Sequence, residues 1–315
     1  MISSADRCRS FEVRTAVSTI ALKIDVDTYR GTLEGVPRLA AALERHGARA
    51  TFLFTLGPDH TGRAIKRVFR RGFLGKVRRT SVVSHYGVRT LLYGVLLPGP
   101  RIGRRCEGVL KRIAARGFEV GVHTWDHVKW QDGVAGADRE WTQHQLALAC
   151  GEFARVFGRA PTAHGAAGWQ MNRYVPQLQA ECGLRYASDT RGRAPFVPLV
   201  EGRPIEVPQL PTTLPTLDEL IGREDLAGVD PIEHLLQLSA GPADHVFTLH
   251  AELEGGAYLE GFERLLAGWR ARGVRLCDLA SYAATLDAAR LPRCPISTGS
   301  VPGRSGVLAV QGEEQ

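Results

Sequence analysis

The sequence predicts an α/β fold in which about seven parallel strands form a barrel with helices packed outside it. Apolar runs of strand length alternate along the chain with amphipathic stretches of helix length. The first run, residues 19–27 (TIALKIDVD), is apolar at every second position and ends in two aspartates. Barrel enzymes place their active sites at the carboxyl ends of the strands. The pattern therefore predicts a fold class and the end of the barrel at which a site would lie.

The alternation along 19–27 assigns each side chain of this strand to a face. One face is wholly apolar and would pack against the outer helices; it consists of Ile20, Leu22, Ile24 and Val26. The other face would point into the barrel; it consists of Ala21, Lys23, Asp25 and Asp27. Both aspartates are thus expected at the mouth of the barrel, where a buried carboxylate needs a partner.

The remaining elements follow from periodicity and from capping residues. Helices are expected over 34–47, 106–117 and 138–158. Strands are expected over 48–57, 118–124, 185–189, 204–210, 245–252 and 274–279. Residues 1–18 are expected to form a loose extension and residues 293–315 an irregular tail. Residues 58–105 are too long for an ordinary strand–helix connection and are interpreted as an insertion.

Positive charge is concentrated in that insertion. The chain carries a net charge of +7, and residues 60–105 contain twelve Lys or Arg and no Asp or Glu. Such a segment is typical of a surface that meets an anionic partner. The aromatic residues of the segment show no pattern typical of nucleic-acid binding. Nothing in the sequence is long and apolar enough to span a membrane, no signal peptide is evident, and the six cysteines form no C-x-x-C pair. A cytosolic protein with reduced thiols is therefore expected.

A second polar motif follows the strand predicted at 118–124. In VGVHTWDH, His123 ends the strand and His127 comes four residues later, a spacing that lets two imidazoles share one ion. One of the two early aspartates would be the third ligand, which leaves the other free to act as a base. Two histidines, one carboxylate and open positions are typical of a catalytic metal site. The alternative is a pair of histidines on a turn without a metal. His250 also ends a strand, and there it could donate a proton to a leaving group or be a core histidine bonded to backbone.

The motifs IDVD, HTWDH and TLH occur in the order and spacing of the polysaccharide deacetylase superfamily, which the chain resembles. The resemblance implies an incomplete, distorted (β/α) barrel, with residues 19–292 as the polysaccharide deacetylase-like (NodB homology) catalytic domain. Stretches such as KIDVDTYRGTLEGVPRL, AAGW, SDTRGRAPFVPL and TLHAELEGGAY are similar to the superfamily's deformylase subgroup. That subgroup removes the formyl group from undecaprenyl-phosphate-linked 4-deoxy-4-formamido-L-arabinose, for lipid A modification and polymyxin resistance.

The resemblance implies a role for each matching residue. Asp27, His123 and His127 would hold one divalent ion: zinc, manganese, cobalt or nickel. Asp25 would be the general base and His250 the general acid. Weaker substrate-binding candidates are Arg30, Trp169, Asp189, Arg191, Glu252 and Glu254. The superfamily often orients its base with the arginine of an R-x-P-Y motif, which this chain lacks, and Gln170 stands where the subgroup has an arginine after Gly-Trp. Arg191 is a candidate substitute.

The prediction is thus a metal-dependent deformylase that works peripherally at the cytoplasmic face of the inner membrane. Arg70, Arg71, Arg78 and Arg79 of the insertion would bind the anionic surface, and nucleic acid is not expected as a partner. The alternatives are an N-acetyl-sugar deacetylase of the same superfamily and a non-catalytic anionic-lipid-binding protein. A formyl-specific pocket, too tight for a methyl group, would distinguish the first alternative. Loss of a metal ligand would favour the second, and none is missing here.

Overall fold

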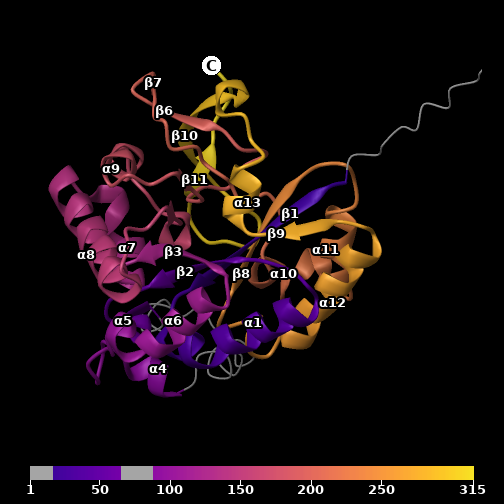
Figure 1. The fold of residues 1–315 in the computed structure, drawn as a ribbon, viewed down its shortest axis with the longest axis horizontal. Coiled ribbons are helices and arrows are strands. Elements are labelled where there is room, and N and C mark those ends of the chain that lie inside the picture. The colour runs from indigo at the N-terminus through magenta and orange to yellow at the C-terminus, as the bar shows by residue number, and fades with distance from the viewer. Residues whose placement is uncertain (1–16, 65–87) are drawn as a thin grey trace, which may run out of the picture.

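The computed structural model describes residues 17–64 and 88–315 (Figure 1). A sheet of seven strands runs through its centre, and every pairing in that sheet is parallel. Its order is β5-β4-β3-β2-β1-β8, and β9 also pairs with β1. The strands are β1 (Thr19–Val26), β2 (Thr51–Thr55), β3 (Glu119–Thr124), β4 (Ala163–His164), β5 (Tyr186–Ala187), β8 (His245–His250) and β9 (Arg275–Cys277). Since β5 and β8 end the order without pairing with each other, the described sheet is an incomplete barrel, as predicted.

Helices cover the apolar face of the sheet. The long helices are α1 (Val36–Arg45), α6 (Glu107–Ala115), α8 (Arg139–Phe157), α11 (Pro231–Leu238) and α12 (Leu259–Ala271). Shorter helices are α4 (Val88–Leu92), α5 (Ile102–Arg105), α7 (His127–Gly133), α9 (Val175–Glu181), α10 (Leu217–Leu220) and α13 (Leu279–Ala283). Single turns are η1 (Gly31–Gly35), η2 (Val134–Gly136), η3 (Ala167–Trp169), η4 (Glu224–Leu226) and η5 (Ala288–Arg290). No helix in the described part of the chain is both long and apolar enough to cross a bilayer.

The face assignment of β1 is confirmed. The four apolar side chains at positions 20, 22, 24 and 26 all belong to the main hydrophobic core, together with residues from α1, α6, α11 and α12. On the opposite face, Lys23 and Asp25 are buried, with 0% and 3% of their surface exposed. The helix predicted over 138–158 is also confirmed: Asp138 caps its start by accepting a hydrogen bond from Trp141 N, and Gly158 ends it with a left-handed φ of 69°.

The helix predicted over 34–47 is confirmed as α1, which the π-helical turn η1 precedes. Two sequence expectations were wrong. Most of 204–210 is not a strand: Pro204 ends a two-residue strand, and Pro208 lacks the N–H that a ladder needs. The C-terminal segment is not irregular: β10 (Arg293–Gly299) and β11 (Leu308–Gln311) pair with β6 (Val197–Val200) and β7 (Arg203–Pro204) in a second sheet, of order β11-β10-β6-β7.

The insertion is described only at its two ends, which lie together. Pro58 and Arg101 form an antiparallel bridge, and Asp59 N donates to Pro100 O at 3.1 Å. Residues 65–87, with Arg70, Arg71, Arg78 and Arg79, lie outside the described residues, as do residues 1–16 of the expected loose extension.

Candidate active site

The parallel pairing of β1 and β8 brings two of the predicted catalytic residues together. Asp25 of β1 lies in register with His250, the last residue of β8. Asp27 follows the end of β1, two residues beyond Asp25. Because the strands are parallel, their carboxyl ends share one edge of the sheet, and β3 brings His123 to the same edge through β2.

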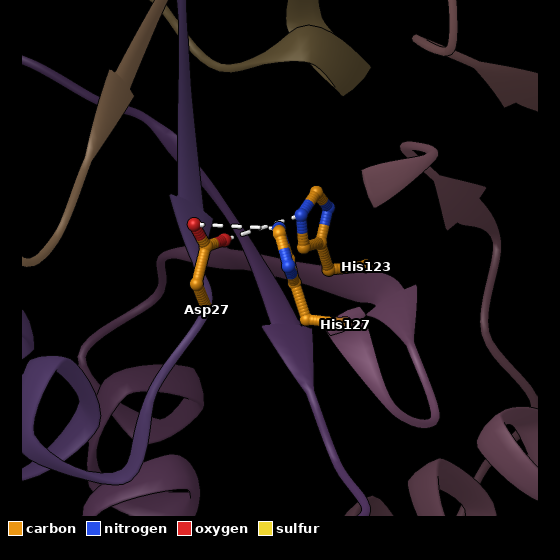
Figure 2. A group of neighbouring side chains, drawn as sticks. All are labelled: Asp27, His123 and His127. Atoms are coloured by element: carbon orange, nitrogen blue, oxygen red, sulfur yellow. Dashed lines mark ion pairs between the residues drawn. The ribbon is translucent and has the colours of Figure 1, made fainter. Parts of the chain in front are cut away.

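Asp27, His123 and His127 converge on one point (Figure 2). Asp27 Oδ1 lies 3.2 Å from His123 Nε2, and Asp27 Oδ2 lies 3.4 Å from His127 Nε2. One ligand atom from each residue falls within 4.8 Å of the other two. His127 is placed by the first turn of α7, whose N-cap Asp126 accepts a hydrogen bond from Lys129 N. These are the three residues that the sequence nominated as metal ligands.

The three side chains fit a divalent ion. Asp27 Oδ1 and His123 Nδ1 are buried and have no hydrogen-bond partner within the described chain. Burial alone would raise the pKa of Asp27, but the neighbouring His127 and His123 outweigh it and hold that pKa well below its ordinary value. Burial lowers the pKa of His127, which favours the neutral imidazole that a metal needs. Two nitrogens and one oxygen suit zinc, manganese, cobalt or nickel.

Asp25 is held by Lys23, a residue whose role the sequence did not reveal. Lys23 Nζ lies 3.3 Å from Asp25 Oδ2 and donates to Ser188 O at 2.9 Å. On the other side, Asp25 Oδ1 lies 3.7 Å from His123 Nδ1. Since Lys23 is fully buried, its ammonium is a fixed counter-charge for the carboxylate. The lysine therefore makes the kind of contact with Asp25 that was expected of an arginine.

Arg191 does not substitute for that arginine. It is buried, makes an ion pair with Glu219 and donates to Leu214 O at 2.9 Å. Asp189 is likewise buried and accepts hydrogen bonds from Ala166 N and from the Gln179 side chain. These contacts give both residues partners within the fold, and their assignment to substrate binding stays a prediction.

The proposed acid, His250, faces a second charged cluster. Its Nδ1 lies 3.6 Å from Asp218 Oδ1, and Asp218 pairs with Arg304 at 2.9 Å. Burial alone would lower the pKa of His250, but Asp218 and Asp27 outweigh it and hold that pKa above its ordinary value of 6.5. His250 therefore keeps its proton to higher pH than an isolated histidine, as a general acid requires.

Trp169 packs against this cluster. Its ring is 2% exposed, and cationic groups of Lys23, Arg191 and Arg304 lie 5.3, 5.1 and 4.8 Å from its centroid. The ring also meets His250 edge-on at 6.3 Å. Trp169 thus contacts the charged residues of the site through cation–π interactions, and its role in substrate binding stays a prediction.

Two buried glutamates fix the loop after β8. Glu252 Oε1 accepts hydrogen bonds from Asp27 N and Thr28 N, at 3.1 and 2.8 Å. Glu254 Oε2 accepts from His250 N at 2.9 Å. Burial raises the pKa of Glu252 to about 8, helped by Asp27, and raises the pKa of Glu254 to about 7. Both residues thus contact the backbone of site residues. Arg30, the remaining candidate, is half-exposed and pairs with Glu34 at 3.1 Å.

The polysaccharide deacetylase family model matches residues 13–187. The chain is 36% identical over 79% of its length to a Shewanella sediminis (strain HAW-EB3) protein, of which the match covers 81%. It is 31% identical over 89% of its length to a Wigglesworthia glossinidia brevipalpis protein, of which the match covers 98%. Both relatives are named probable 4-deoxy-4-formamido-L-arabinose-phosphoundecaprenol deformylase ArnD. The chain belongs to the polysaccharide deacetylase family.

Two solved structures share the fold. A Mycobacterium smegmatis protein named for the polysaccharide deacetylases aligns with a TM-score of 0.63 and 18% identity, over 95% of this chain and 98% of its own. The Puue allantoinase aligns with a TM-score of 0.58 and 14% identity, over 86% and 91%. Together with the two deformylase relatives, the family membership makes this polysaccharide deacetylase a hydrolase that acts on an amide bond.

Sequence reasoning missed Lys23, Asp218 and Arg304 as parts of the site. A signal for Lys23 was present, because it shares the inner face of β1 with both aspartates. Asp218 and Arg304 lie more than 80 residues apart and meet only through the fold, so no local pattern could have joined them.

Replacing Lys23 with Met should lower kcat by about 100-fold or more, the scale of a general base's contribution, because Asp25 loses its fixed counter-charge. Metal content, measured by elemental analysis, should stay near wild type, and Lys23→Arg should recover part of the rate. In an Asp25→Asn background the same Lys23→Met change should cost little further rate. An equal loss in both backgrounds would show that Lys23 does not act through Asp25.

Proposed function

We propose that the protein removes the formyl group from a lipid-linked 4-deoxy-4-formamido-L-arabinose, releasing formate and the free amino sugar. The observation that carries this proposal is the convergence of Asp27, His123 and His127 beside Asp25 and His250. The two relatives named as deformylases support the choice of substrate. A role in lipid A modification and polymyxin resistance follows from the same names and is part of the proposal.

The residues divide the hydrolysis of the amide among them. A divalent ion held by Asp27, His123 and His127 would supply Lewis acidity toward the amide carbonyl. Asp25, fixed by Lys23, takes a proton from the attacking water. His250, protonated beside Asp218, gives a proton to the leaving nitrogen, which is a poor leaving group as a free amide anion. The amine and formate then leave as separate products.

Formate release tests the substrate. The purified metal-loaded protein should release formate from the undecaprenyl-phosphate-linked formamido sugar and release little acetate from its N-acetyl analogue. Product quantification by mass spectrometry would measure both rates. Faster acetate release would instead establish the alternative, an N-acetyl-sugar deacetylase of the same family.

Different substitutions should abolish metal binding and proton transfer. His127→Ala should lose most of the bound metal and the activity together, because it removes a ligand. Asp25→Asn should keep the metal and lose turnover by about 100-fold or more, because the amide cannot accept the proton. Elemental analysis alongside initial rates distinguishes the two. Full metal content in His127→Ala would contradict the ligand assignment.

The alkaline limb of the pH–rate profile should report His250. A raised pKa keeps His250 protonated to higher pH, so activity is lost only as the pH rises through that pKa. Asp218→Asn removes the facing negative charge and leaves Arg304 nearby, while Asp27 and Glu254 remain. The alkaline limb should therefore move to lower pH with the acid limb unchanged. An unmoved alkaline limb would remove His250 from the role of acid.

We also propose that the protein works at the cytoplasmic face of the inner membrane, because an undecaprenyl substrate must be met at a bilayer. Cations near an anionic leaflet contribute about 1 kcal/mol each. Sedimentation with anionic vesicles should pull down the protein in low salt. Replacing Arg70, Arg71, Arg78 and Arg79 with Ser should weaken that binding. Equal binding of this variant to neutral vesicles at high salt would rule out the electrostatic account.

A further inference from the structure

A cavity of about 280 Å³ lies beside the catalytic residues and has no part in the chemistry described above. Its wall comes from two segments that each begin at the site. One runs from Thr28 through η1 into α1, directly after Asp27, and the other runs from Ala251 to Ala257, directly after His250. Pockets for drug-sized ligands usually measure 300–1,000 Å³, so this cavity suits a group of about one sugar ring.

Glycines bring the two segments together. A Cβ on Gly35 would lie 2.0 Å from Ala251 O, and one on Gly255 would lie 2.4 Å from the same oxygen. A Cβ on Gly31 would lie 2.0 Å from Glu252 Oε1. The wall between them includes the π-helical turn η1, and such turns are rare and frequently occur at functional sites. The backbone of this region is therefore shaped around Glu252.

The polar groups of the cavity are complementary to a ligand that carries a hydroxyl group and a negatively charged group. Glu252 is 9% exposed, and its Oε2 has no hydrogen-bond partner among the described residues, although its Oε1 accepts from Thr28 Oγ1 at 2.8 Å. Two guanidinium groups, Arg30 and Arg38, also line the cavity. Arg30 pairs with Glu34, whereas Arg38 has no carboxylate partner within the described ranges. A buried polar atom without a hydrogen-bond partner is costly, and an arginine pair suits a phosphate.

We propose that this cavity binds the sugar phosphate end of the substrate, with Arg38 and Arg30 pairing with the phosphodiester and the Glu252 side chain forming a hydrogen bond with a sugar hydroxyl. The inference rests on the proposed function and extends it. In the substrate the formamido group and the phosphate lie on different carbons of one sugar ring. The ring would then bridge the metal ligands and the cavity, which share Glu252 through its hydrogen bond from Asp27 N.

The test measures binding of a soluble probe, an alkyl phosphodiester of L-arabinose without the formamido group, to the full-length metal-loaded protein by calorimetry. Arg38→Ala should weaken binding by about 10- to 100-fold, the equivalent of one charge-assisted hydrogen-bonded contact. Arg38→Lys should recover only part, since an ammonium cannot pair bidentately. Arg290→Ala, at an exposed arginine of η5, makes the same change in net charge and should bind like wild type.

Wild-type affinity in Arg38→Ala, or an equal loss in Arg290→Ala, would overturn the assignment. Inorganic phosphate should bind more weakly than the probe; equal binding would overturn the role of Glu252 toward the sugar. Because the probe carries no amide, its binding is independent of formate release. Arg38-dependent binding without formate release would refute the proposed reaction alone, and formate release with Arg38-independent binding would refute the cavity alone. Circular dichroism melting of each variant controls for folding.

Discussion

The parallel pairing of β1 with β8 and β2 is the constraint on which the site depends. β1 pairs with three strands, and in its register with β8 Asp25 lies opposite His250. Because side chains alternate along a strand, a slip of one residue would turn Lys23 and Asp25 into the apolar core and their apolar neighbours into the site. The fully buried apolar face of β1 therefore fixes the position of the Asp25 carboxylate as well as the fold.

The charges at the edge of the sheet stabilise one another in turn. Lys23 neutralises Asp25, Asp25 faces His123, and His123 and His127 face Asp27. A buried charge without a partner costs several kcal/mol, whereas a complete set of partners offsets much of the cost of burial. Trp169 adds a surface that three cationic groups share. The charged residues of the site therefore depend on one another electrostatically. A substitution at a residue such as Lys23 also affects the charged residues beside it.

The sequence predicted what local patterns can encode. The alternation of β1 and the spacing of His123 and His127 predicted the fold class and the candidate metal ligands, although the choice of Asp27 over Asp25 came from the family resemblance. The sequence position of Arg191 does not reveal Glu219 as its partner. Strands β4 and β5 have two residues each and carry no period. The pairing of Asp218 with Arg304 depends on the second sheet, which returns the C-terminal segment to the site.

Glu252 contacts both the cavity and the backbone of Asp27. Ligand binding in the cavity can therefore be coupled to the reaction at the site without a conformational change. Glu252 Oε1 holds the backbone of Asp27 and Thr28, while the Glu252 side chain forms a wall of the neighbouring cavity. A group bound in that cavity would therefore be positioned by the same carboxylate that positions a metal ligand. Binding energy gained far from the reacting bond can be used to orient that bond. With the proposed substrate, such a site would favour an amide carried on a sugar phosphate over the same amide on a neutral sugar.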